Sequence, residues 1–247
     1  MSDQNPDTEN FDPVGKHTLE VISGATRFNK WMYAEIKPFL KGDILEIGSG
    51  IGNISQYVIN NGYDITLSDY NPAYYKYLQE NFSKTPNVRS ILQLDLLHPD
   101  FKTEYAALEE KFDTIFMLNV IEHLKDDPIA VDNCKFMLKQ NGHFIVLAPA
   151  YNWLYCRIDK ELGHYRRYTL KKMKQLIKDQ NMEVINGQYF NFLGTIGWFL
   201  FGKVFKRKML GKEMNSFNQL VPIAKLLDKL FMKRIGLSVI VTGKKKI

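Results

Sequence analysis

Three glycines alternate with other residues in the stretch Ile44–Asn53, directly after a short apolar run. Glycine lets the backbone turn tightly and lets a ligand approach it, and a following helix offers free N–H groups. The glycines are Gly48, Gly50 and Gly52, a spacing that differs from the G-x-G-x-x-G of a dinucleotide loop. Glu46 precedes them, and its negative charge is unfavourable beside a pyrophosphate. The stretch therefore predicts a loop for a ligand that carries an ammonium or sulfonium group.

Polar side chains also stand at the ends of the next three apolar runs. Asp69 follows the glycines at about the 20-residue distance at which an acid can accept hydrogen bonds from ribose hydroxyls. Asp95 is placed to accept from an adenine amino group, and Asn119 ends the fourth run. Each residue alone is equally well explained as a helix cap or a turn residue. Because the carboxyl ends of parallel strands share one edge of a sheet, together they predict a single crevice for an adenosyl ligand.

These motifs resemble those of the class I S-adenosylmethionine-dependent methyltransferases. The resemblance covers about residues 28–150 and the closing strands. It implies a Rossmann-like fold, S-adenosyl-L-methionine as the cofactor, S-adenosyl-L-homocysteine as its product, and methyl transfer to an acceptor. The residues that it assigns to the cofactor are Glu46, Gly48, Ser49, Gly50, Gly52, Asn53, Asp69, Tyr70, Asp95, Leu96, Asn119 and Val120.

A second string, Gly163–Tyr168, reads GHYRRY and follows the fifth apolar run. It is similar to a motif of a bacterial subgroup of these methyltransferases, some of them associated with lipid-carrier and sugar transferases. We expect His164 to act as the general base that takes a proton from an acceptor hydroxyl. We expect Arg166 and Arg167 to orient an anionic group of the acceptor, since adjacent guanidinium groups can fork onto a carboxylate or phosphate.

The same string also has a structural interpretation. One of its arginines can pair with Asp159 or Glu161, and Thr169 can cap the following helix. His123, which follows Glu122 after the fourth run, is more often a residue that packs against the cofactor or caps a helix. The 5 histidines and 2 cysteines form no metal-ligand spacing, so no metal is expected.

The rest of the chain predicts an α/β protein with a doubly wound sheet, because short apolar runs alternate with stretches of helical periodicity. Strands are expected at residues 43–47, 65–68, 88–94, 114–118, 143–148, 183–189 and 237–242. Helices are expected at residues 51–61, 72–82, 101–110, 128–139 and 170–180. The resemblance implies a mostly parallel seven-stranded sheet, in which the last strand is antiparallel and lies between the fifth and sixth.

Residues 1–15 are expected to form a disordered tail and residues 16–247 one methyltransferase domain, which begins with one or two helices within residues 17–40. An apolar and basic insertion of about residues 192–234, expected to be helical, departs from a minimal member of the family. It can cover the sheet edge, act as a lid over a hydrophobic acceptor, or make a peripheral membrane contact through residues 192–212.

The net charge of +6 is uneven, because residues 184–247 hold most of the excess lysine and arginine. This favours an anionic surface or substrate nearby, although a solvated basic face explains it equally. No nucleic-acid recognition motif appears. The polar, acidic start contains no signal peptide and the cysteines show no pairing pattern, so we expect a cytoplasmic protein, with the inner face of the membrane as an alternative.

The predicted function is methyl transfer to a small molecule, most simply to an oxygen of a hydrophobic, aromatic or lipid-linked compound. One alternative is a non-catalytic protein that binds S-adenosylmethionine or a partner. The other is a nicotinamide-dependent oxidoreductase, which the glycine spacing and Glu46 disfavour. The oligomeric state is left open.

Overall fold

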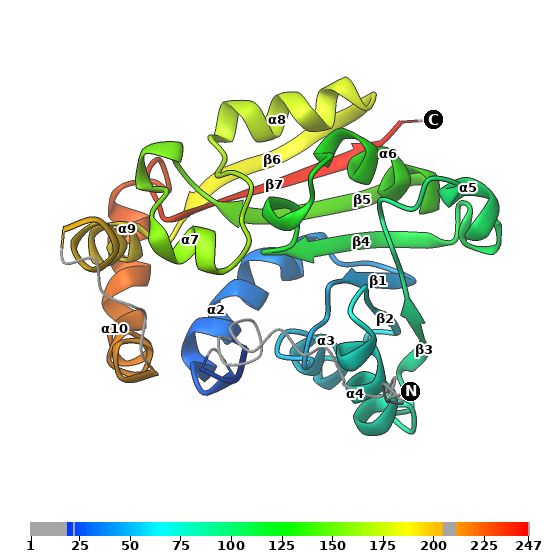
Figure 1. Ribbon diagram of the computed structural model, residues 1–247, viewed down its shortest axis with the longest axis horizontal. Coiled ribbons are helices and arrows are strands. Elements are labelled where there is room, and N and C mark those ends of the chain that lie inside the picture. The colour runs from blue at the N-terminus through cyan, green and yellow to red at the C-terminus, as the bar shows by residue number, and fades with distance from the viewer. Residues whose placement is uncertain (1–18, 22, 205–210, 247) are drawn as a thin grey trace, which may run out of the picture.

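Figure 1 presents the computed structural model of the chain, which describes residues 19–21, 23–204 and 211–246. One sheet of seven strands has the order β3-β2-β1-β4-β5-β7-β6. Strands β1 to β5 pair in parallel, and β7 pairs antiparallel with both of its neighbours. The predicted fold class is confirmed, including the place of the last strand between the fifth and the sixth.

The elements agree with the predicted order. The strands are β1 (Ile44–Ile47), β2 (Ile65–Asp69), β3 (Val88–Gln93), β4 (Phe112–Leu118), β5 (Leu138–Pro149), β6 (Met182–Phe190) and β7 (Ser238–Lys245). The α-helices are α2 (Thr26–Ile36), α3 (Ser55–Asn60), α4 (Pro72–Phe82), α5 (Phe101–Glu104), α6 (Asp127–Met137), α7 (Arg157–Glu161), α8 (Leu170–Asp179), α9 (Phe192–Trp198) and α10 (Gly211–Leu230). The 3₁₀ turns are η1 (Lys37–Phe39), η2 (Ala106–Leu108), η3 (Ile121–His123) and η4 (Asn152–Leu154), and η5 (Phe199–Val204) is π-helical.

Several helices begin where a short polar side chain caps them. The side chain of Asn71 accepts a hydrogen bond from the backbone N–H of Ala73 at 2.9 Å, and Pro72 occupies the start of α4. Asp126 and Thr169 cap α6 and α8 in the same way. These residues satisfy N–H groups that the first helical turn leaves without a partner, so the helix starts are set by the local sequence.

Two predicted helices are shorter in the structure. The helix expected over residues 51–61 is α-helical only from Ser55, because the backbone first completes the glycine loop, where Gly52 has a φ of +81°. The helix expected over residues 101–110 divides into α5 and η2. Between them, Tyr105 turns its hydroxyl toward the end of β3, where it accepts a hydrogen bond from the backbone N–H of Asp95 at 3.2 Å.

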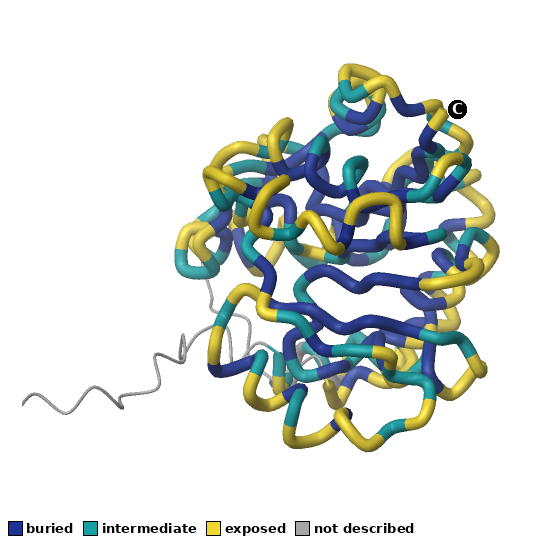
Figure 2. Tube along the Cα trace, turned by 90° about the vertical axis from the view of Figure 1, so that its right-hand side faces the viewer, coloured by how far each residue is buried: buried dark blue, intermediate teal, exposed yellow. Residues whose placement is uncertain are grey.

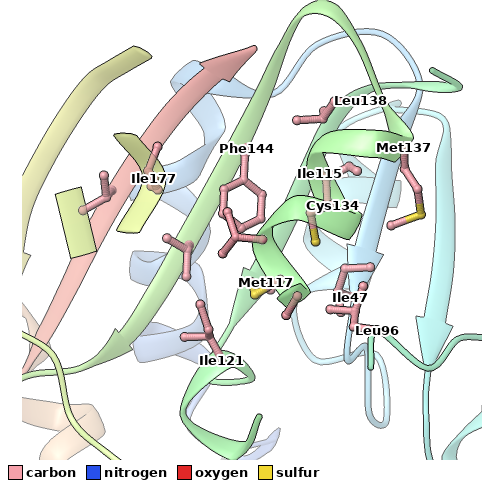
Figure 3. Close-up of a cluster of buried hydrophobic side chains, with 14 of the residues drawn as sticks. Ile47, Leu96, Ile115, Met117, Ile121, Cys134, Met137, Leu138, Phe144 and Ile177 are labelled. Carbon is pink, nitrogen blue, oxygen red and sulfur yellow. The ribbon is translucent and has the colours of Figure 1, made fainter. Parts of the chain in front are cut away.

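Apolar clusters fill both faces of the sheet, as a doubly wound arrangement requires. On one face, Cys134 and Met137 of α6 lie beside Ile115 and Phe144 of the central strands (Figure 3). On the other face, α2, α3, α4 and α10 contribute the buried side chains. Figure 2 shows the result: the central strands are buried along most of their length, whereas the edge strands β3 and β6 are mostly half-buried and many connecting loops are exposed. The sheet is thus a rigid base for the loops at its edge.

The insertion is helical, as predicted, in the part that the structure describes, namely α9, η5 and α10. Figure 1 shows α9 and α10 together at one end of the molecule. The side-chain oxygen of Asn218 in α10 accepts hydrogen bonds from the backbone N–H groups of Arg27 and Phe28, at 2.9 and 3.1 Å. The carboxylate of Asp228 accepts from the backbone of Asn191 and Phe192. The insertion is therefore anchored to the first turn of α2 and to the end of β6.

The predicted disordered tail, residues 1–15, lies outside the described residues, as do residues 205–210 of the insertion. A turn at Gly24 separates the helical residues before it from α2, which agrees with two helical segments before the first strand. Across the described part of the chain, no helix combines the length and the apolar composition that crossing a bilayer demands.

Candidate functional site

The glycine loop joins β1 to α3 and has a backbone that favours glycine. Gly48, Gly50 and Gly52 have φ angles of +69°, +55° and +81°, in the region that side chains rarely adopt. A Cβ atom on Gly48 would lie 2.5 Å from Cγ2 of Val120, and one on Gly52 would lie 2.4 Å from the ring of Phe82. The loop therefore needs glycine both for its turn and for its close contact with neighbouring segments.

Asp69, at the end of β2, supports this loop directly. Its Oδ2 accepts a hydrogen bond from the backbone N–H of Gly50 at 2.9 Å, and its Oδ1 accepts one from Asn71 at 2.9 Å. Burial raises the pKa of the Asp69 carboxyl above its ordinary value, against the effect of these hydrogen bonds. Ser49 donates its backbone N–H to the carbonyl of Ser68 at 2.8 Å. The structure thus brings Asp69 and the glycine loop together, as the sequence predicted.

Glu46 is the buried acid of β1 beside the loop. The hydroxyl of Ser55 donates a short hydrogen bond to its Oε2. Burial raises the pKa of Glu46 to about 7, the hydrogen bonds from Ser55 and Ser49 lower it, and the negative Asp69 raises it further. A positively charged group bound near this carboxyl would favour its ionised form, because opposite charges at short distance stabilise each other. The contact of Glu46 with a cationic ligand stays a prediction.

The other predicted cofactor residues stand at the ends of β3 and β4. The backbone N–H of Leu94 donates to the carbonyl of Asp69 at 3.2 Å, which places the end of β3 next to that of β2. Asp95 is half-buried there, and its Oδ1 accepts a hydrogen bond from the backbone N–H of Leu97 at 2.8 Å. Leu96 is buried in the core. Asp95 therefore has the turn-forming role that was its alternative interpretation, and its contact with an adenine stays a prediction.

Asn119 is exposed and has a φ of +56°, with its backbone N–H donated to the carbonyl of Leu147 at 2.9 Å. Its neighbour Val120 packs against the glycine loop, so this segment borders the same crevice. Tyr70, which follows Asp69 at the end of β2, is 67% exposed. Asn53 points elsewhere, because its side-chain amide donates to the carbonyl of Leu19 at 3.2 Å.

A cavity of about 540 Å³ borders the loop on its other side. Gly52, Tyr57, Asn81 and Phe82 contribute to its walls, so it lies among α3, α4 and the N-terminal segment. Glu46, Asp69 and Asp95 do not line this cavity. The acids at the strand ends therefore lie outside this cavity.

The GHYRRY string forms the loop between α7 and α8 and closes around one buried acid. Nδ1 of His164 and Nε of Arg167 lie 2.9 and 2.7 Å from the same oxygen of Asp159. Arg167 also donates to the carbonyl of Ala150 at 3.0 Å. Although burial opposes ionisation of Asp159, the His164 hydrogen bond and the Arg167 charge outweigh it and hold the pKa of that carboxyl below its ordinary value. An ionised Asp159 accepts from Nδ1–H of His164, which leaves the lone pair of His164 on Nε2.

The two arginines bind acids of the protein itself. Arg166 donates to Asp127 at 2.5 Å and to the carbonyl of Lys125 at 2.6 Å. Arg167 pairs with Asp159, and only 1% of its side chain is exposed. This agrees with the structural interpretation of the string, as does the Thr169 cap. In this arrangement Arg167 supports the loop, and contact of either arginine with an acceptor stays a prediction.

Glu122 is the residue that the sequence reasoning did not assign to the site. It lies in η3 directly after β4, is fully buried, and has no hydrogen-bond partner for either carboxylate oxygen within the described part of the chain. Burial raises its pKa to about 8; the backbone N–H of Glu122 itself and the positive Arg167 oppose this, and the negative Asp159 adds to it. Its Oε1 lies 4.0 Å from Nε2 of His164. The backbone N–H of Tyr165 donates to the carbonyl of Glu122 at 2.8 Å and fixes the two segments together.

His123 completes this group. Its ring packs edge-on against that of His164, with centroids 4.7 Å apart, and it is exposed while its two neighbours are buried. Ligand atoms of Glu122, His123 and His164 all lie within 4.8 Å of one another. In the sequence, this cluster was indicated only by Glu122, an acid within the apolar segment that follows β4.

Comparison with known proteins places these features in a family context. Residues 45–144 match the model of the family described as "Methyltransferase domain". The probable polyketide synthase 42 of Dictyostelium discoideum is 26% identical over 192 residues, which cover 68% of this chain and 7% of that protein. The chain therefore spans only a small part of the length of this relative.

Solved structures show the same fold. A SAM-dependent methyltransferase from Archaeoglobus fulgidus has a TM-score of 0.58 and 13% identity, over 88% of this chain and 94% of that one. The phosphoethanolamine N-methyltransferase 2 of Haemonchus contortus, in complex with S-adenosyl-L-methionine, has a TM-score of 0.62 and 16% identity, over 98% of this chain and 59% of that one. The chain has the Rossmann-like methyltransferase fold.

Proposed function

We propose that this chain is an S-adenosylmethionine-dependent methyltransferase that acts on a hydroxyl group of a hydrophobic small molecule. The observation that carries the proposal is the group of polar residues that meet at the strand ends. There the glycine loop hydrogen-bonds to Asp69 and lies beside Glu46, a buried acid whose pKa of about 7 suits a cationic ligand. The family match over residues 45–144 supports the same activity.

The residues of the crevice fit this cofactor. The bound cofactor supplies a methyl group activated by a positively charged sulfur. Glu46 would pair with the positive charge of its methionine part, and Asp69, which keeps further lone pairs on both oxygens, would accept from the ribose hydroxyls. The glycines leave room for close approach of the ligand to the backbone. Holding the reacting groups in line contributes most to the rate, about 7–11 kcal/mol in favourable cases.

On the acceptor side, His164 supplies the lone pair that activates the acceptor hydroxyl. Asp159 and Arg167 hold its ring, so that Nε2 presents this lone pair toward Glu122 and His123. Removal of the hydroxyl proton during attack typically increases the rate about 10²–10⁴-fold. Arg167 acts here as a positioning residue, through Asp159.

The insertion supports a hydrophobic or lipid-linked acceptor. The guanidinium of Arg167 lies 4.6 Å from the centroid of the Trp198 ring, which connects α9 to the loop of His164. Trp153, after β5, packs at 6.0 Å against Phe199, and both side chains remain largely exposed. We propose that this apolar surface contacts the acceptor. A peripheral membrane contact of the predicted segment 192–212 is the alternative use of the same surface.

Calorimetry with S-adenosylhomocysteine and with NADH tests the cofactor. We expect one site for S-adenosylhomocysteine and no binding of NADH. Asp69→Ala should abolish binding, whereas Asp132→Ala, which removes a half-buried acid of α6 that pairs with Lys102, should leave it unchanged. Binding of NADH alone would favour the oxidoreductase alternative.

Methyl transfer is tested by incubating the protein and labelled cofactor with a cell extract. We expect label in an organic-soluble product, with Asp69→Ala as the inactive control. Cofactor binding with no transfer in any fraction would instead favour the non-catalytic binding protein.

A further inference from the structure

We propose that Glu122, His123 and His164 form a binding site for a divalent transition-metal ion, most simply Zn²⁺, at the acceptor side of the crevice. The substrate class that follows from it, an acceptor bound through its hydroxyl oxygen, rests on the proposed methyltransferase function. The metal site itself is argued from the side chains alone.

The donor set is the first argument. Two imidazoles and one carboxylate form a common protein ligand set for catalytic zinc, which leaves a further position open. An ion with bonds of about 2.0–2.1 Å holds tetrahedral ligand atoms roughly 3.4 Å apart. The corresponding atoms here lie within 4.8 Å of one another, and the pair from His164 and Glu122 is 4.0 Å apart. A small adjustment of the exposed His123 side chain would therefore bring the three donors onto one ion.

The carboxylate of Glu122 is the second argument. A fully buried carboxyl whose oxygens have no hydrogen-bond partner is costly, because no side-chain hydrogen bond replaces those that it made to water. Such a group in a native fold calls for an explanation. A cation bound by both neighbouring imidazoles would provide the missing partner.

The partners of His164 are the third argument. A histidine that binds a metal through one ring nitrogen usually donates the other N–H to a carboxylate, which fixes its orientation. His164 has this arrangement, because its Nδ1 meets Asp159 at 2.9 Å and the opposite nitrogen faces Glu122. Arg167 in turn fixes Asp159. Asp159 and Arg167 therefore hold the imidazole of His164 with Nε2 directed to the proposed metal position.

The position of the cluster connects it to methyl transfer. Glu122 follows Val120 in the chain by two residues, and Val120 touches the glycine loop at Gly48. Exposure of His123 opens the cluster to solvent, and so to an acceptor. A bound ion would lower the pKa of an acceptor hydroxyl on its open position. That hydroxyl then loses its proton to water, its oxygen forms a bond to the methyl carbon, and the carbon–sulfur bond breaks with its electron pair returning to sulfur. In the metal-bound protein Nε2 of His164 would therefore bind the ion instead of accepting the proton, and the ion would take over the activation of the hydroxyl.

Metal binding to the full-length protein tests the proposal without any assay of activity. After chelator treatment and dialysis, the protein is titrated with Zn²⁺ by calorimetry, with Mg²⁺ as the comparison ion. Co²⁺ serves as a spectroscopic probe, because its visible absorption reports coordination by nitrogen and oxygen ligands in tetrahedral geometry. We expect one Zn²⁺ per chain, intense Co²⁺ bands, and much weaker binding of Mg²⁺, which prefers oxygen ligands.

Three variants locate the ion. Glu122→Gln has the same shape, and His123→Ala changes an exposed side chain, so both should keep the fold. Each of these two variants, and also His164→Ala, should weaken Zn²⁺ binding by roughly 100-fold or more. His143→Gln is the matched control: it alters a histidine that binds the carbonyl of Phe39, away from the cluster, and should leave binding unchanged.

Absence of stoichiometric Zn²⁺ binding, or equal binding by the wild type and Glu122→Gln, would overturn the metal site. Calorimetry with S-adenosylhomocysteine on the same samples separates this result from failure of the proposed function. Loss of cofactor binding with an intact Zn²⁺ site would remove the methyltransferase proposal alone. Methyl transfer at full rate by metal-free protein would overturn the role of the ion in methyl transfer, whereas the metal site itself is decided by the Zn²⁺ titrations.

Discussion

Gly48 and Val120 meet so closely that a Cβ atom on the glycine would lie 2.5 Å from Cγ2 of the valine. The contact joins the loop after β1 to the segment after β4, on which Glu122 and His123 lie. Because neighbouring atoms in a packed interior cannot move independently, the shape of the cofactor loop and the position of the acceptor side are coupled.

Gly48→Ala should disturb both. The substitution combines an unfavourable φ of +69° with an overlap on Val120, and we expect binding of S-adenosylhomocysteine to weaken by about 10-fold or more. Gly62→Ala is the matched control, because its φ is +78° but no atom lies within 4 Å of the added Cβ. It should cost stability, about 1–2 kcal/mol, without affecting binding. Equal calorimetric affinities for the two variants would contradict this account.

Cofactor affinity should rise with pH through neutrality. The folded-state pKa of Glu46, about 7, is above its ordinary value of 4.5, and only the ionised form pairs with a positive ligand. At pH 6 about a tenth of the carboxyl is ionised and at pH 8 about nine tenths, so the dissociation constant should fall about tenfold between them. Calorimetry at both pH values measures it. Glu46→Gln should bind weakly at either pH, and an unchanged slope in this variant would assign the effect to another group.

The same carboxyl should make the ligand-free protein lose stability as pH rises. A group with a raised folded-state pKa binds its proton more tightly in the native than in the unfolded state. Its stabilising contribution is therefore complete below about pH 4.5 and is lost as pH rises through 7. Urea unfolding of wild type and Glu46→Gln over this range should show the difference, with the variant gaining relative stability toward high pH.

Arg167 should matter more for stability than Arg166, although the two are adjacent. Arg167→Gln leaves Asp159 buried without its main counter-charge, a change that typically costs about 3–5 kcal/mol. Arg166→Gln removes a partner whose side chain is 31% exposed, so water can replace part of the interaction with Asp127. Urea unfolding of both variants measures the two losses. A larger loss for Arg166→Gln would show that the buried pair does not hold the loop.

Asn218→Ala should destabilise the anchoring of the insertion. Its side-chain oxygen is the acceptor for two N–H groups at the start of α2, a role like that of a helix cap supplied from another helix. Loss of such a cap typically costs about 1 kcal/mol. Gln219→Ala, at an exposed neighbouring position, should change the free energy of unfolding little. Identical unfolding curves for the two variants would show that water replaces the cap fully.

Local features of the sequence were sufficient for the succession of elements and for the cofactor side of the site. Runs such as residues 144–148 are apolar throughout, which indicates a strand buried on both faces, and Thr169 has a side chain suited to capping the helix that follows it. The glycine loop and Asp69 belong to consecutive elements of one parallel sheet, so their meeting at the strand ends follows from chain order. The place of β7 between β5 and β6 was implied only by the family resemblance.

The acceptor side depended on tertiary structure. Sequence alone left open which arginine would pair with Asp159, because residues of one short loop all lie within reach of it. It held no sign that Glu122 and His164 would meet, since β5, α6 and α7 separate them in the chain and only the packing of η3 against the loop of His164 brings them together. Local chemistry sets caps, turns and strand ends, whereas contacts between distant segments depend on how the whole sheet places its loops.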